Sequence, residues 1–284
     1  MQSTRVTFPD GSLTGEGDVL IVDRERAVVV VDATPFHPVD HTWPDQPGDS
    51  GTITVSDVVL DVSEAVMAAV SDEGELAVGT DIPVKRGAEG WTWLVGHRVD
   101  GEIPASVVAG ASARLEVDAA RRAGLSRGHT ACHLASLALD AALADLWRKE
   151  IGVDPLGHPD FEGRANQTSF IHPDGSVDEY RLGKSLRKAG FDSEGFAASL
   201  AQREQRINDL LAGWIASGGE SRIDVEGPGI SDRRTWRCVL PEGEVGFLCG
   251  GTHVHSVAEF ASISVALDLS DPQLLVMTAT AVPA

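Results

Sequence analysis

Short apolar runs separated by turn residues fill the first third of the chain. Residues 27–31 (AVVVV) form a β-branched run that is too short for an ordinary helix and is typical of a buried strand. Apolar and polar positions partly alternate in four further segments, which we predict as strands: 52–62, 64–70, 91–95 and 113–117. Many short strands joined by Gly, Pro and Asp turns predict a small β-barrel.

Prolines interrupt this pattern between residues 35 and 51. A strand inside a sheet donates its backbone N–H groups, and proline has none to donate. We therefore expect an irregular connection around four prolines: Pro35, Pro38, Pro44 and Pro47.

Helical spacing of apolar residues begins after residue 118. From Ser126 to about Glu150 the chain has no proline, and apolar residues recur three or four positions apart, with Ser126 as the expected N-cap. A second helix is predicted over residues 193–215, where an apolar stripe runs beside charged positions. Strand-like segments lie between and after these helices: 168–171, 177–182, 222–225, 235–240, 263–269 and 274–282.

Helices mixed with antiparallel-looking strands predict an α+β fold rather than a doubly wound α/β fold. We expect an N-terminal small β-barrel domain over residues 1–118. An α+β domain with a long helix and an antiparallel sheet should follow over residues 119–284.

Composition narrows the function classes. The chain has 284 residues, 42% of them hydrophobic and 23% charged, which is typical of a globular protein. Twenty-three Lys and Arg against 43 Asp and Glu give a net charge of −20, which disfavours a protein that coats DNA or binds anionic membranes. A nucleic-acid substrate would need a local basic patch, and the candidates form three groups: Arg121, Arg122 and Arg127; Arg181, Lys184, Arg187 and Lys188; Arg233, Arg234 and Arg237.

The sequence also predicts a cytoplasmic protein without a membrane partner. Its N-terminus lacks the basic and apolar segments of a signal peptide. No apolar run reaches the roughly 18 residues that a membrane span needs. Three cysteines, Cys132, Cys238 and Cys249, are too few for a disulfide framework.

Two short motifs carry the chemistry. In HTACH, His129 and His133 are four residues apart, which places both imidazoles on one face of a helix. In CGGTH, paired glycines allow a tight turn, so that Cys249 and His253 can point at one place. Three imidazoles and a thiolate form a donor set that suits Zn²⁺. Either pair alone is a weak signal, and Thr130 stands where the HExxH motif of zinc proteases has its glutamate.

These motifs support a family resemblance. HTACHL and LCGGTHV resemble the HTATHL and CGGTHV motifs of the editing domain of alanyl-tRNA synthetases and of free-standing alanyl-tRNA editing proteins of the AlaX type. Residues 34–38 (TPFHP) and 46–51 (QPGDSG) resemble the T-x-F-Y-P and Q-x-x-D-x-G elements of that family's N-terminal barrel. The resemblance covers most of the chain and is poor over residues 151–165 and at the C-terminal end.

The resemblance implies a zinc-dependent hydrolase that removes the amino acid from mischarged Ser-tRNA(Ala), with Gly-tRNA(Ala) as a further candidate substrate. The chain is too short to include the synthetase's activation domain, so we expect it to act in trans. Its partner would be the mischarged tRNA, with no DNA and no membrane involved.

The resemblance also suggests four catalytic candidates. The family has a Q-x-G-S element after the first helix, and the matching segment here is Asn166, Gln167, Thr168 and Ser169. Gln167 or Asn166 would position the water or the ribose, and Thr168 or Ser169 would hydrogen-bond the seryl hydroxyl. A polar turn before a strand explains each of these residues equally well.

Four protein ligands raise a question about the zinc. Catalytic zinc usually keeps three protein ligands and one open position, whereas four ligands form a closed structural site. Either one ligand is exchangeable, or the coordination expands to five, or the ion orients the substrate amine while another group activates water. We expect three firm ligands and one exchangeable one.

Several nearby residues have more ordinary interpretations. Glu259 either supports a zinc histidine or is a surface acid, and His255 is expected to face solvent. Cys132 is expected to serve packing and Cys238 to lie in the core. The family's loop before Gln46 is rich in glycine, whereas this chain has a longer loop with Trp43, which either stacks on the terminal adenine or packs under the loop.

Two other functions remain open. The first is the same chemistry on Ser-tRNA(Thr), because the editing domain of threonyl-tRNA synthetase is a relative of the alanyl family. The second is a zinc-stabilised tRNA-binding or regulatory protein without catalysis. The sequence leaves the oligomeric state open.

Overall fold

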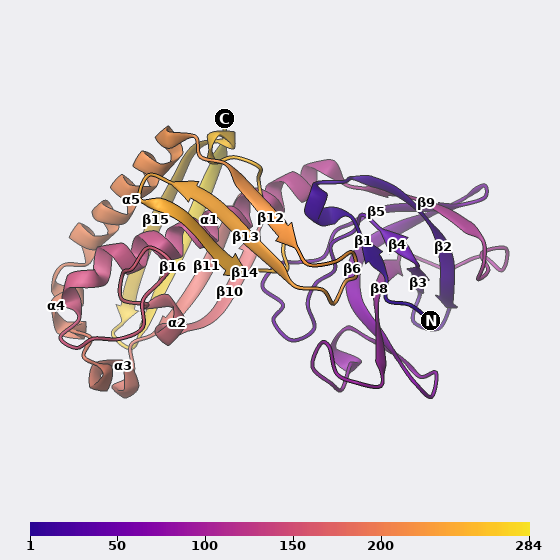
Figure 1. Cartoon of the computed structure of the whole chain (residues 1–284), viewed down its shortest axis with the longest axis horizontal. Coiled ribbons are helices and arrows are strands. Elements are labelled where there is room, and N and C mark those ends of the chain that lie inside the picture. Colours follow the sequence, from indigo (N-terminus) through magenta and orange to yellow (C-terminus); the bar gives the residue numbers. More distant parts are fainter. The chain divides into compact units, whose positions relative to one another are not determined.

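The computed structural model describes all 284 residues and mixes helices with strands, including one large sheet (Figure 1). Contacts divide the chain into two compact units. The first comprises Met1–Ala123, Ile223–Thr235 and Cys249–Thr252, and the second comprises Gly124–Arg222, Trp236–Leu248 and His253–Ala284. The domain boundary near residue 118 stays a prediction.

The first unit is built around an antiparallel seven-stranded sheet. One strand, β5, pairs with β9 and also with β6. The order across the sheet is β5 (Gly51–Val55), β9 (Ser112–Val117), β2 (Thr14–Asp23), β3 (Val28–Val31), β8 (Trp91–Val99), β6 (Val58–Ser71) and β7 (Leu76–Val78). A short parallel pair joins β1 (Arg5–Val6) to β4 (Ala33–Thr34).

The valine run explains how this sheet is buried. All four residues of β3 have no exposed surface. Val29 and Val31 belong to one hydrophobic cluster, and Val28 and Val30 belong to another. Because alternate residues of a strand point to opposite faces, the sheet is covered on both faces at β3.

The proline-rich segment 35–51 is irregular up to the start of β5, as predicted, apart from one isolated bridge between Val39 and Val66. Short 3-10 turns lie elsewhere in the first unit: η1 (Phe8–Asp10) and η2 (Gly79–Asp81). The long strand β2 (Thr14–Asp23) was not predicted from the sequence.

The helix that carries HTACH, α1 (Ala119–Leu143), begins earlier and ends earlier than predicted. The carboxylate of Asp118 accepts hydrogen bonds from the backbone N–H groups of Ala120 and Arg121, both at 3.0 Å, so Asp118 caps the helix. The prediction of Ser126 as the N-cap is wrong, because Ser126 lies inside α1. After Leu143 the chain continues as a 3-10 turn, η3 (Ala144–Leu146), rather than as a helix to residue 150.

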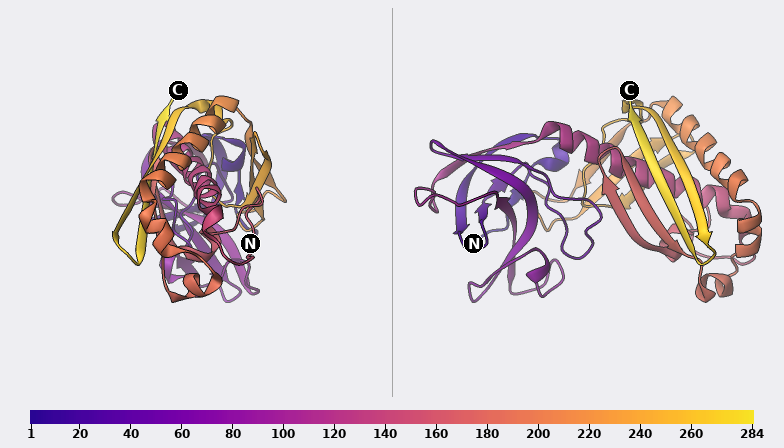
Figure 2. Two further views of the ribbon diagram at one scale, coloured as in Figure 1. Left: turned by 90° about the vertical axis from the view of Figure 1, so that its left-hand side faces the viewer. Right: turned by 180° about the vertical axis from the view of Figure 1, so that it is seen from behind.

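A four-stranded antiparallel sheet forms the core of the second unit. Helix α5 (Leu200–Ser217) packs along its edge strand β15 (Figure 2). The order across this sheet is β10 (Asn166–His172), β11 (Gly175–Arg181), β16 (Leu274–Pro283) and β15 (Phe260–Asp271).

The single helix predicted over residues 193–215 is two helices, α4 (Ser193–Ala198) and α5, because Ser199 leaves the helical conformation at φ −117° and ψ 16°. The remaining elements are α2 (Glu162–Ala165), α3 (Lys184–Ala189), the 3-10 turn η4 (Val257–Glu259) and a three-stranded sheet in the order β12 (Ser221–Val225), β13 (Arg234–Leu240), β14 (Gly243–Leu248). None of the helices combines the length and the apolar character that crossing a membrane requires.

Candidate metal centre

Three histidine rings of the second unit lie against one another. His129 and His133 are one turn apart on α1, and their ring centroids are 4.8 Å apart. The ring of His253 lies 4.5 Å from that of His129 and 5.1 Å from that of His133. The helical spacing therefore brings His129 and His133 together, as predicted from the sequence. His253, more than a hundred positions further along the chain, lies against both rings.

The fourth residue, Cys249, stands on a turn that its own unit holds in place. Its backbone N–H donates to the carbonyl of Arg234 at 3.1 Å, and the N–H of Gly251 donates to its Sγ at 3.5 Å. The amide of Gln46 binds Thr252 twice: Nε2 donates to Oγ1 at 2.9 Å, and Oε1 accepts from the backbone N–H at 3.0 Å. Gln46 is buried, so this clamp is shielded from water.

The four predicted ligands form one cluster that could hold a metal ion. Their ligand atoms, three imidazole nitrogens and one sulfur, all lie within 4.8 Å of one another. A tetrahedral zinc ion with bonds of about 2.0–2.3 Å needs donor atoms about 3.3–3.8 Å apart. Modest rotation of the side chains would bring the four ligand atoms to these separations. The chemistry of the donors fits zinc, because imidazole and thiolate are its preferred ligands.

Aromatic rings enclose His133. The centroid of Trp236 lies 4.9 Å from that of His133, and Phe247 stacks on it at 5.2 Å. Burial lowers the pKa of His133 to about 4, so its ring is neutral at pH 7. A neutral imidazole has the lone pair that a metal ion requires.

The thiol of Cys249 is held in its protonated form. Burial is the main cause, and together with nearby Asp45 it raises the pKa of Cys249 to about 12, although the Gly251 N–H and Arg234 act in the opposite direction. A metal ion binding here would have to displace the thiol proton, because only the thiolate is a good ligand.

Thr130 orients one of the histidines. Its Oγ1 donates to the carbonyl of Ser126 at 2.9 Å, which uses its only proton. Its contact with Nδ1 of His253, at 3.1 Å, is therefore one in which Nδ1–H donates. This leaves Nε2 of His253 as the lone-pair nitrogen. Sequence analysis noted Thr130 only as a departure from HExxH and missed this role.

The four catalytic candidates begin β10, and their roles stay predictions. Asn166 and Ser169 are half-buried, and Nδ2 of Asn166 donates to Oγ of Ser169 at 3.2 Å. Gln167 is exposed and its amide turns back to the carbonyl of Asn166 at 2.8 Å. Thr168 is also exposed and donates to Glu179 at 3.2 Å. Of the four, Asn166 and Ser169 therefore face the interior.

A buried polar network links Ser169 to α1. Asp178 on β11 hydrogen-bonds Ser169, accepts from Ser176 at 2.8 Å, and lies 3.4 Å from Sγ of Cys132. Cys132 directly precedes His133 and is buried, as its predicted packing role requires. Burial raises the pKa of Asp178 despite these hydrogen bonds. Sequence analysis missed Asp178, although it alternates with Ser176 and Tyr180 on the buried face of the strand.

A second buried acid lies beside this network. Burial raises the pKa of Glu162 to about 8, although the neighbouring Tyr180 and Asn166 side chains act in the opposite direction. Glu162 was also missed, because an acidic residue in a short turn gives no sign of burial in the sequence.

The other nearby acids and thiols have structural roles. Glu259 caps η4: its Oε1 accepts from the N–H groups of His255 and Ser256 at 2.7 and 3.1 Å. His255 is exposed, as expected, and Cys238 is fully buried. Trp43 is 49% exposed, at the end of a turn that the Asp40 carboxylate holds.

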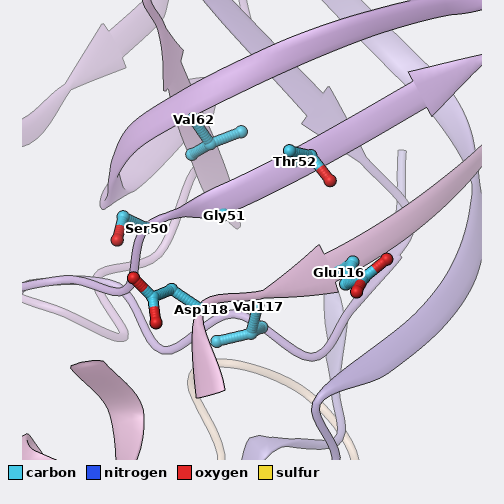
Figure 3. A pocket seen from close by; sticks show the side chains of 7 residues that line it. All are labelled: Ser50, Gly51, Thr52, Val62, Glu116, Val117 and Asp118. Atoms are coloured by element: carbon cyan, nitrogen blue, oxygen red, sulfur yellow. The ribbon is translucent and has the colours of Figure 1, made fainter. Parts of the chain in front are cut away.

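Several of the predicted basic residues are already paired. Arg122 is buried and binds the Asp49 carboxylate, Arg127 pairs with Asp174, and Arg237 lies 3.3 Å from Glu244. The first unit also has an open pocket between β5 and β9, but two carboxylates line it, and it holds no histidine or cysteine (Figure 3). Its lining residues are Ser50, Gly51, Thr52, Val62, Glu116, Val117 and Asp118.

Comparison with known proteins adds no name to this site. No protein-family model matches the chain, and no curated protein matches it.

Proposed function

We propose that the protein is a zinc-dependent hydrolase that deacylates mischarged Ser-tRNA(Ala), and also Gly-tRNA(Ala), in trans. One observation carries the proposal: the ligand atoms of HTACH and CGGTH, from distant parts of the chain, lie within 4.8 Å of one another. The motif resemblance requires this clustering, and unrelated histidines and cysteines would have no reason to produce it.

The proposal gives each residue of the cluster a role in binding or orienting a zinc ion. A zinc ion bound here would lower the pKa of water to about 7 and polarise the ester carbonyl. His129, His133, His253 and Cys249 would hold it, with Thr130 fixing the orientation of His253. The structure describes no second cluster of this kind.

Selectivity for serine would come from the polar end of β10. Asn166 and Ser169 are half-buried and already hydrogen-bonded to each other, so either can accept or donate to a seryl hydroxyl after a small rotation. Alanine would leave these half-buried polar groups without that partner, which costs binding free energy. This is why the correctly charged Ala-tRNA(Ala) would be spared.

The architecture supports the same assignment. Because β5 pairs with both β9 and β6, the pairing of strands runs round from β5 back to β5, as in the small β-barrel that we propose for the first unit. A hydrolase of charged tRNA works where translation occurs, so we propose a cytoplasmic location.

Hydrolysis of Ser-tRNA(Ala), measured with and without a chelator, tests the proposal. We expect deacylation by the zinc-loaded protein, loss after chelation, and loss in His129→Ala and Cys249→Ala. Cys238→Ala is the matched control, because Cys238 is a buried cysteine outside the cluster. Full activity after chelation, or in both cluster variants, would refute the proposal. Faster hydrolysis of Ser-tRNA(Thr) than of Ser-tRNA(Ala) would indicate that Ser-tRNA(Thr) is the substrate.

The complete ligand set favours one alternative, a zinc-stabilised tRNA-binding protein without catalysis. Four protein ligands form a closed site, as structural zinc does. Binding of Ser-tRNA(Ala) without turnover, together with loss of folding after chelation, would favour this alternative.

A further inference from the structure

Two arginines of the first unit lie beside the turn that carries Cys249. The carbonyl of Arg234 accepts the N–H of Cys249 at 3.1 Å. One terminal nitrogen of Arg86 lies 3.7 Å from the point where a Cβ on Gly250 would stand. The turn is therefore hydrogen-bonded to Arg234 and lies close to the Arg86 side chain.

The guanidinium of Arg234 is buried and only partly satisfied. The residue is 4% exposed, its two terminal nitrogens donate to the carbonyls of Ile230 and Gly229 at 3.1 and 2.8 Å, and the group lies 5.1 Å above the ring of Phe8. Its Nε–H has no hydrogen-bond partner. A buried donor without an acceptor is costly, and a cationic one more so, which indicates that an acceptor belongs there.

A second unpartnered group also contacts Phe8. The ring of His37 meets that of Phe8 edge-on at 5.1 Å, and its buried Nδ1 has no partner. Burial and the neighbouring arginines lower the pKa of His37 to about 4, although Asp49 acts in the opposite direction, so the ring is neutral at pH 7 and can donate one N–H.

Two guanidinium groups lie close together at this place. Burial, and after it the charge of Arg86, lowers the pKa of Arg234 to about 10, with Asp232 only partly compensating. Arg86 pairs with Asp40 yet keeps about a third of its side chain exposed. Two neighbouring guanidinium groups, one with an unused N–H, form the kind of site that binds a tetrahedral oxyanion.

We infer that Arg86 and Arg234 form a phosphate-binding site beside the Cys249 turn, with His37 as a further donor. The inference rests on the proposed function for its ligand, a phosphodiester near the 3′ end of the charged tRNA, next to the ester to be cut. The site would place the end of the strand, and it explains how a chain of net charge −20 can hold a polyanion locally.

Calorimetric titration tests the site without relying on turnover. The probes are inorganic phosphate and the dinucleotide cytidylyl-adenosine, added to the full chain after chelation, so that phosphate cannot bind a metal ion. We expect Arg86→Gln and Arg234→Gln to weaken binding of both probes at least tenfold. Arg233→Gln is the matched control: it removes the same charge from the adjacent, exposed arginine and should change affinity less than twofold.

Arg86→Gln keeps the site testable if Arg234→Gln fails to fold, because about a third of the Arg86 side chain is exposed whereas Arg234 is buried. Equal losses in Arg86→Gln and Arg233→Gln, or no binding of either probe to the parent protein at millimolar concentration, would overturn the site. If Arg234→Gln bound zinc more weakly but phosphate as well as the parent protein does, the phosphate site would also be overturned. Arg234 would then act on the Cys249 thiolate instead. Phosphate binding retained by a protein that does not deacylate Ser-tRNA(Ala) would refute the hydrolase and leave the anion site standing.

Discussion

Thr130 orients one histidine of the candidate metal centre without being one of its four possible ligands. Its hydroxyl ties Nδ1 of His253 to the backbone of α1, and it also accepts the N–H of Val254 at 3.2 Å. Removing a group that orients a metal-binding histidine typically costs 10–100-fold in metal affinity.

We therefore expect Thr130→Val, which keeps the shape of the side chain, to weaken zinc binding about 10–100-fold. Competition with a chromophoric chelator measures this. Thr130→Ser retains the hydroxyl and should bind zinc within about threefold of the parent protein. If the valine and serine variants bind zinc equally, the hydroxyl does not orient His253.

A different residue should control how stability varies with pH. Burial raises the pKa of Asp140 to about 8, even though its Oδ1 accepts the N–H groups of Phe161 and Glu162 at 2.9 Å each. The folded protein therefore holds this proton more tightly than the unfolded chain, whose Asp pKa is near its ordinary value. Stability from this group is fully present below about pH 4 and is lost as pH rises toward 8.

Asp140→Asn keeps the Oδ1 acceptor and removes the titration. We expect the melting temperature of Asp140→Asn to rise relative to that of the parent from pH 5 to pH 8, because the unfolded parent gives up this proton near pH 4 whereas the folded parent holds it until about pH 8. Thermal unfolding followed by circular dichroism at the two pH values measures the difference. An equal difference at both pH values would mean that Asp140 is already ionised at pH 5.

At the level of secondary-structure elements, helix α5 stabilises the edge strand of a sheet. Strand β15 is the edge of the four-stranded sheet, and one face of its backbone would lack partners. The side chain of Asn208 on α5 pairs with both backbone groups of Val265: its Oδ1 accepts from the N–H at 2.7 Å, and its Nδ2 donates to the C=O at 2.9 Å. Glu204 accepts from the N–H of Leu267 at 2.8 Å.

Asn208→Ala should therefore destabilise the protein by about 1–3 kcal/mol, since it leaves both groups of Val265 without a partner. Hydrogen exchange should show faster exchange of the Val265 amide than in the parent. Gln202→Ala, on the exposed face of the same helix, is the control and should leave both quantities nearly unchanged. Unchanged protection of Val265 in the Asn208 variant would contradict this role.

Element positions were predictable where the periodicity is local, and wrong where tertiary packing decides. The strands predicted over residues 91–95 and 113–117 lie within β8 and β9. The start of α1 was not predictable in this way, because Gly124 and Gly128 lower helix propensity before the apolar stripe begins. The structure shows why glycine is there: a Cβ on Gly124 would lie 2.9 Å from that of Pro173, and one on Gly128 would overlap the carbonyl of His172. A close approach of this kind leaves no pattern in the sequence.

The candidate metal centre was likewise predictable only where the sequence pattern is local. Spacing predicts which side of α1 carries His129 and His133, and the motif resemblance pairs them with CGGTH. The clamp between Gln46 and Thr252 joins residues 206 positions apart, and the surroundings of the unpartnered Nε of Arg234 are set by two backbone carbonyls and a ring. Neither has a sequence signal, because both are defined only once distant segments are packed.

Charge distribution matters at the scale of the whole molecule. The net charge of −20 repels nucleic acid at long range, and Arg122 and Arg127, which flank HTACH, are occupied by Asp49 and Asp174. Recognition of tRNA would then depend on a few local contacts near the ester rather than on a broad basic face. This is the reason for proposing a dedicated anion site beside Cys249.

Metal binding should also stabilise the chain as a whole, and it should do so more strongly at higher pH. A ligand at 100 times its Kd that binds only the folded state adds about 2.7 kcal/mol, which for a chain of this size raises the Tm by about 5–10 °C. Because burial raises the pKa of Cys249 to about 12 and lowers that of His133 to about 4, zinc binding between pH 6 and 8 displaces the proton of the thiol and none from His133. Apparent affinity should therefore rise at least about tenfold for each pH unit in this range. Differential scanning fluorimetry across zinc concentrations at pH 6, 7 and 8 measures both effects, with His133→Ala expected to show no zinc-dependent shift. A shift of equal size in that variant, or an affinity independent of pH, would mean that zinc binds somewhere other than this cluster.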